Sequence, residues 1–126
     1  MTIRAEFQPT VDEFISNLNS FATGDYLKAE EKEFWDQPFD PAVLPELKST
    51  LEKFLDALDV LPADPSAEML VKVVQVTVDD LTDFNEKNHG AVLEPEEMAE
   101  LNELIHDASA ATGADDEALA ELPEID

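Results

Sequence analysis

The chain has 126 residues, 31 acidic side chains against 7 basic ones, a formal net charge of −24 and no cysteine. This length fits one domain, and its 44% of hydrophobic residues exceeds what a wholly disordered acidic chain carries. The charge excludes binding driven by nucleic-acid phosphates or anionic membranes, and the lack of cysteine excludes disulfides and thiolate chemistry.

The N-terminal segment predicts an extended arm followed by a helix. Residues 3–7 alternate apolar and polar side chains and precede Pro9, a pattern typical of a short arm or edge strand. Thr10 and Glu13 have the spacing of a capping box, which predicts that a helix begins there and covers residues 10–22.

The next helix follows a proline-rich connector. Residues 36–45 contain three prolines, each of which lacks a backbone donor and disfavours helix in the preceding residue. Beyond them, residues 45–61 are predicted to form an amphipathic helix. Its apolar positions recur at helical spacing: Leu47, Leu51, Phe54, Leu55, Leu58 and Leu61.

Residues 65–89 are ambiguous because they contain many β-branched side chains. Their length, uninterrupted by glycine or proline between 66 and 89, favours a helix. A strand over residues 70–78, paired with residues 2–7, is the alternative and would give an α+β fold. In the helical reading Val71 and Val78 lie at the edge of a wide apolar surface, which predicts either a core face or a homodimer contact.

Residues 95–112 are predicted to form the last long helix, and residues 114–126 an acidic, marginally ordered tail. The sequence therefore predicts an all-α fold in which four main helices pack as a bundle. Residues 1–113 would form its single domain. No stretch is long and apolar enough for a signal peptide or a membrane span, so we expect a soluble, cytoplasmic protein.

The acidic charge is concentrated toward the C-terminus. Residues 91–126 contain 12 acidic side chains and no basic one, which is half of the net charge of −24. Within the last long helix, four carboxylates recur at i, i+4, i+7 and i+11, about 5–6 Å apart along the axis and opposite the apolar stripe. This carboxylate row consists of Glu96, Glu100, Glu103 and Asp107.

Two E-x-x-H pairs raise the question of a metal site. Glu86 with His89, and Glu103 with His106, have the spacing that di-iron helical bundles use. On a helical wheel both pairs point away from the apolar stripes, so they are predicted to be solvated surface residues. We expect no metal and no other cofactor. The sequence also contains no phosphate-binding glycine loop and no nucleophile motif, which argues against an enzyme.

Three functions remain open at this stage. The leading hypothesis is a non-enzymatic binding protein whose carboxylate row engages a basic protein surface, as an inhibitor, an immunity-like protein or a nucleic-acid mimic. The alternative is a small helical protein, monomeric or homodimeric, whose acidity is an environmental adaptation. The third is a metal-binding carboxylate bundle.

Overall fold

The computed structural model describes residues 2–25, 27–32 and 35–125, and these residues contain helices and no strand. The predicted all-α fold is confirmed, and residues 70–78 are helical. In chain order the elements are α1 (Ile3–Thr23), α2 (Ala29–Lys32), the 3₁₀ turn η1 (Pro41–Val43), α3 (Leu44–Asp59), α4 (Ala67–Lys87), α5 (Pro95–Ala110) and α6 (Asp116–Ala120).

The predicted N-terminal arm is wrong, because residues 3–7 are the first turns of α1. Pro9 lies inside this helix, and the capping box at Thr10 and Glu13 does not form. Ile3 and Phe7 are four positions apart and continue the helical spacing of the buried Val11. The same residues fit an alternating pattern over a short window, which explains the wrong prediction.

Two caps fix the start of α1. The Thr2 hydroxyl accepts a hydrogen bond from the backbone N–H of Ala5 at 3.0 Å. The carboxylate of Asp59, at the end of α3, accepts from the N–H groups of Ile3 at 2.7 Å and Arg4 at 3.0 Å. These acceptors satisfy three of the donors that a helix leaves without an internal partner.

The remaining long helices begin and end close to their predicted bounds. Pro45 occupies the first turn of α3, where a missing N–H costs nothing. Helix α4 begins two residues later than predicted because Ser66 is its cap, with its hydroxyl accepting from the N–H of Met69 at 3.3 Å. Helix α5 begins at Pro95, as predicted.

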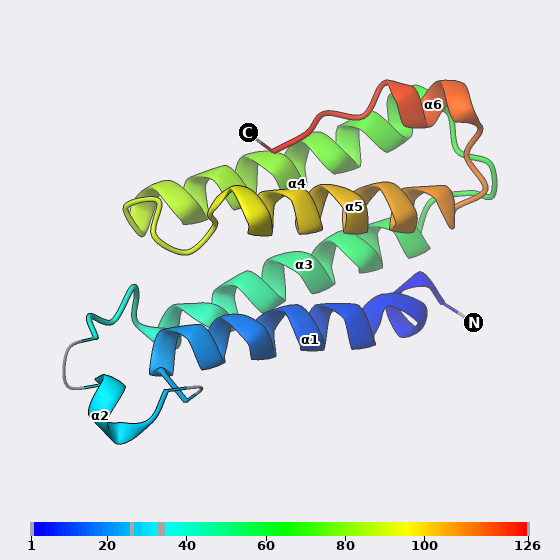
Figure 1. Ribbon diagram of the computed structural model, residues 1–126. Coiled ribbons are helices and arrows are strands. Elements are labelled where there is room, and N and C mark those ends of the chain that lie inside the picture. The colour runs from blue at the N-terminus through cyan, green and yellow to red at the C-terminus, as the bar shows by residue number, and fades with distance from the viewer. Residues whose placement is uncertain (1, 26, 33–34, 126) are drawn as a thin grey trace.

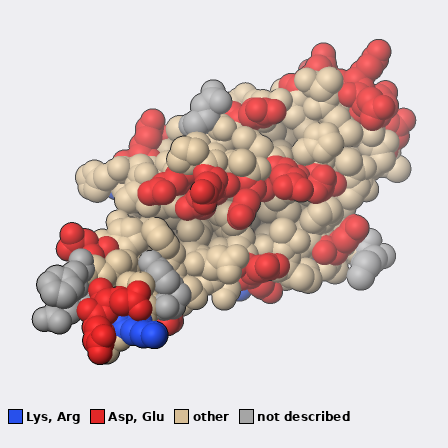
Figure 2. All heavy atoms as spheres, viewed as in Figure 1, with Lys and Arg blue, Asp and Glu red and all other residues tan. Residues whose placement is uncertain are grey.

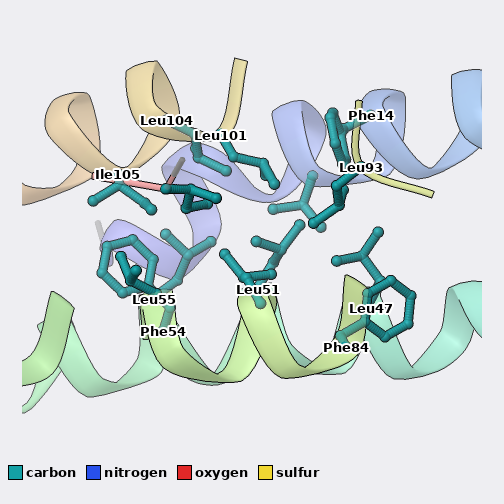
Figure 3. Packing of buried hydrophobic residues seen from close by; sticks show 14 of the residues in the cluster. Phe14, Leu47, Leu51, Phe54, Leu55, Phe84, Leu93, Leu101, Leu104 and Ile105 are labelled. Atoms are coloured by element: carbon teal, nitrogen blue, oxygen red, sulfur yellow. The ribbon is translucent and has the colours of Figure 1, made fainter. Parts of the chain in front are cut away.

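The four long helices form two layers around one apolar core (Figure 1). Helix α3 packs against both α1 and α4, and α5 packs against α1 and α3. The close view in Figure 3 places α1 and α5 on one side of the core and α3 and α4 on the other. The core is largest along α3, whose completely buried side chains include Leu47, Leu51 and Leu55.

Two asparagines attach irregular segments to this bundle. The Asn85 side chain donates to the carbonyl of Leu93 at 3.0 Å and accepts from its N–H at 2.9 Å, which closes the connection between α4 and α5. Asn102 of α5 makes the same pair of bonds with Ile125, at 3.1 and 2.9 Å. Helix α6 packs against α4 and α5, and the side chain of Ile125 is buried.

Candidate acidic binding site

The carboxylate row lies on the solvent side of α5. The opposite side of this helix is buried through Leu101, Leu104 and Ile105, so the residues between them point outward. All four members of the row are exposed. Figure 2 shows the resulting line of carboxylates across the face formed by α1 and α5.

Three members of the row border a groove between α1 and α5. The groove has a volume of about 390 Å³, and we call it the acidic groove. Glu13 contributes a fourth carboxylate from α1, and Glu96 lies outside the groove. The lining residues are Phe7, Thr10, Glu13, Phe14 and Asn17 of α1 with Glu100, Leu101, Glu103, Leu104 and Asp107 of α5.

The acidic groove combines an apolar floor with an acidic rim. Phe14, Leu101 and Leu104 are buried, and their side chains form part of its lining. No lysine or arginine lines it within the described part of the chain. The rim carboxylates therefore have no positive neighbour in the groove itself.

The ion pairs of lysine and arginine occur on other surfaces. Arg4 bridges Glu52 at 3.1 Å and Asp56 at 2.7 Å, which joins α1 to α3. Lys48 pairs with Asp12 at 3.3 Å, and Lys87 pairs with Glu46. Among the described residues, no lysine or arginine lies within ion-pair distance of a member of the row.

Two carboxylates in different parts of the molecule have pKa values shifted in opposite directions. Burial raises the pKa of Glu97, beside the row, and the neighbouring carboxylates Glu94 and Glu96 raise it further. In contrast, a hydrogen bond from Gln8 and the nearby Lys48 lower the pKa of Asp12. Negative charge is thus compensated between α1 and α3 and left uncompensated along α5.

Histidine contributes little to the row. His106 Nδ1 lies 3.6 Å from a carboxylate oxygen of Asp107, a contact that is an ion pair only when the imidazole is protonated. The Glu103–His106 and Glu86–His89 pairs are exposed. Over residues 2–25, 27–32 and 35–125, no three acidic or histidine side chains converge on a position suited to a metal ion.

The two valines predicted at a core or dimer face differ in burial. Val78 is only 7% exposed and belongs to the core, whereas Val71 is half-buried. The most exposed valine of α4 is Val76, at 57%. Val78 thus lies in the core, and a role of Val71 in a contact between copies stays a prediction.

Comparison with protein-family models, with curated proteins and with solved structures gives no match to this chain. The class that the fold and site define is a small acidic four-helix bundle with a carboxylate-rimmed groove. None of the helices that the structure describes is both long and apolar enough to cross a membrane.

Sequence reasoning found the row but missed Glu13. The row lies on one helix, so helical spacing alone places its members on one face. Glu13 reaches the groove because α1 packs beside α5, and the two segments are far apart in the chain. The available signal was the spacing of Thr10, Glu13 and Asn17, which marks a second polar stripe along α1.

Proposed function

We propose that this chain is a non-enzymatic binding protein that engages a basic protein surface through the acidic groove and the carboxylate row. The observation that carries the proposal is the groove itself, in which four carboxylates from two helices surround an apolar floor and no cation lines the rim among the described residues. Like charges held this close favour a partner that neutralises them.

The chemistry of the groove suits arginine and lysine side chains. Both have aliphatic stems that pack on apolar surface while the charged head remains at a polar rim. Phe14 and Leu104 offer that surface, and Glu13, Glu100 and Glu103 offer acceptors for the head groups. A guanidinium is favoured over an ammonium because its planar fork can bond two carboxylate oxygens at once.

The row favours an elongated basic surface over a single basic residue. Its carboxylates repeat about every 5–6 Å along the helix axis. A protein surface that otherwise binds a nucleic-acid backbone carries basic side chains in comparable arrays. An inhibitor, an immunity-like protein and a nucleic-acid mimic would all use such an array, with electrostatic steering giving rapid capture.

The test neutralises the row while keeping side-chain size. The row variant carries Glu96→Gln, Glu100→Gln, Glu103→Gln and Asp107→Asn. Its matched control changes four exposed acids on other surfaces: Glu30→Gln, Glu31→Gln, Asp36→Asn and Glu68→Gln. The probe is an arginine-rich peptide at low salt. We expect the row variant to bind at least about tenfold more weakly than the wild type, and the control to lose far less.

Circular dichroism checks that the comparison is fair. Removing like charges spaced three or four residues apart should stabilise the helix by about 0.2–0.5 kcal/mol per pair. Helicity should therefore be unchanged or slightly raised. Equal losses of affinity in the row variant and the control would contradict the proposal, because they would show that only net charge matters. That result, with a fold that gains stability in high salt, would instead support acidity as an environmental adaptation.

A further inference from the structure

The residues that follow α6 occupy a site on α5 that recognises a peptide backbone. After α6 the chain turns back toward the middle of α5 (Figure 1), where the Asn102 side chain accepts from the N–H of Ile125 at 2.9 Å and donates to its carbonyl at 3.1 Å. Both bonds involve backbone groups, so any residue except proline could form them. The Ile125 side chain is only 4% exposed. We call Asn102 and the surface that buries this side chain the Ile125 site.

Few other contacts hold this part of the chain. Among the described residues, residues 115–125 form no hydrogen bond with the rest of the molecule except the two with Asn102, and they form no ion pair. Ala118 is buried, and Leu119 and Leu122 pack partly buried against the core. Two hollows flank the segment, one of about 400 Å³ beside α5 and one of about 670 Å³ beside the start of α4. The segment is therefore attached mainly by small apolar contacts and one asparagine.

The charge of this segment opposes its attachment. Residues 114–126 contain six acidic side chains and no basic one, so 18 of the 24 net negative charges belong to the rest of the chain. Like charges repel, and docking the segment brings its acidic side chains close to an acidic body. The groups that fix the segment are an aliphatic side chain and the backbone of one residue, and neither is charged. A neutral peptide could make the same contacts without the repulsion.

We propose that the Ile125 site binds a short peptide of a partner protein, and that residues 114–125 occupy the site as an autoinhibitory segment until the partner displaces them. The peptide has a leucine, a proline, any residue and an isoleucine in succession. This pattern is that of the segment itself, in which Leu122 packs on the core, Glu124 is exposed and Ile125 is buried. Pro123 restricts its own backbone and that of Leu122, which lowers the cost of ordering the peptide.

The tethered segment sets how strongly a free peptide binds. A segment joined by a short connection competes at an effective concentration of about millimolar. The apparent affinity of the free peptide is reduced by the fraction of time for which the site is empty. Releasing the segment should therefore raise that affinity. The proposal does not depend on the acidic groove, because Asn102 does not line it.

The first test releases the segment in the full chain. The probe is a fluorescent peptide, amidated at its end, with the sequence Leu-Ala-Gln-Leu-Pro-Gln-Ile-Ala, in which glutamine replaces each glutamate of residues 119–125. Ile125→Asp removes the buried side chain, and it should bind this peptide at least about tenfold more tightly than the wild type does. The matched control is Ala120→Asp, which adds the same charge at an exposed position of the segment and should bind like the wild type.

The second test concerns recognition of the backbone. A peptide methylated on its isoleucine nitrogen lacks the N–H that Asn102 accepts, so it should bind Ile125→Asp at least about tenfold more weakly than the unmodified peptide. In a chain that carries both Asn102→Ala and Ile125→Asp, the two peptides should bind equally weakly, because the partner of that N–H is gone. Circular dichroism checks that each variant keeps its helices.

Three results would overturn the proposal. One is equal binding of the unmodified peptide to the wild type and to Ile125→Asp. Another is equal binding of the methylated and unmodified peptides to Ile125→Asp. The third is a wild type of twice the 14.0 kDa chain mass that becomes monomeric in Ile125→Asp, because the segment would then occupy the site of a second copy.

Discussion

Asp59, the last residue of α3, connects the end of that helix to the first turn of α1. Its carboxylate oxygens each accept one backbone N–H from the first turn of α1, from Ile3 and Arg4. Such an arrangement is a helix cap supplied by a residue distant in sequence. The sequence could not reveal it, because capping from another helix leaves no local pattern.

Replacing Asp59 should therefore destabilise the protein out of proportion to its exposed position. We expect Asp59→Ala to lower the free energy of unfolding by about 1–2 kcal/mol, since two N–H groups lose their acceptor. Urea denaturation measures this loss. The control is Asp56→Ala, which removes only the ion pair to Arg4 and should cost less. Equal losses in the two variants would contradict the capping role.

Glu97 should make the protein slightly less stable at neutral pH. Burial raises its pKa in the folded state, so ionisation of Glu97 favours the unfolded chain. The penalty is absent below the ordinary glutamate pKa of 4.5 and develops as the pH rises through the raised folded value.

Glu97→Gln should accordingly stabilise the protein at pH 7 and make no difference in acid. The measurement is thermal unfolding of the wild type and of Glu97→Gln between about pH 3.5 and 7. Asp12→Asn should instead lower the stability at pH 7. The lowered pKa of Asp12 stabilises the fold above the usual aspartate range, and this stabilisation is lost as the pH falls. A Glu97→Gln effect that does not change with pH would refute the assignment to ionisation.

At the scale of helices, amphipathic spacing predicted most of the architecture. Helices α3, α4 and α5 coincide with the predicted segments within about two residues, because each has a continuous apolar stripe and a proline near its start. The helical reading of residues 70–78 also proved correct, since length outweighs β-branched composition. Helix α1 was predicted only in part, because proline usually lies before or in the first turn of a helix, whereas α1 continues through Pro9.

Helix α6 and the following residues depend on one side chain of α5. The Asn102 side chain makes two hydrogen bonds with the backbone of Ile125, and the Ile125 side chain is buried. We expect Asn102→Ala to speed amide hydrogen exchange over residues 114–125 while the four long helices keep their protection.

The matched control for this prediction is Asn85→Ala. Asn85 binds Leu93 through the same pair of bonds, so its loss should speed exchange in residues 88–94 instead. Exchange in residues 114–125 that is unaffected by Asn102→Ala would show that α6 and the side chain of Ile125 hold this segment without the asparagine.

At the scale of the whole molecule, basic side chains are distributed unequally between the two layers. The face of α1 and α5 carries the acidic groove and the row (Figure 2), and the side of α3 and α4 carries lysines beside an apolar groove. The sequence predicted the acidic helix face but not this division between layers. Segment charges follow from composition, whereas the pairing of α1 with α5 is a property of the folded chain.

The most direct measurement of the central claim is the salt dependence of binding to the arginine-rich peptide, compared among the wild type, the row variant and its matched control. If the carboxylates of α5 receive the peptide, the affinity of the wild type and of the control should fall steeply as sodium chloride rises from about 0.05 to 0.5 M, and the row variant should show a much shallower slope. Parallel slopes for all three proteins would contradict the account, because the row would then contribute no more than any other four charges.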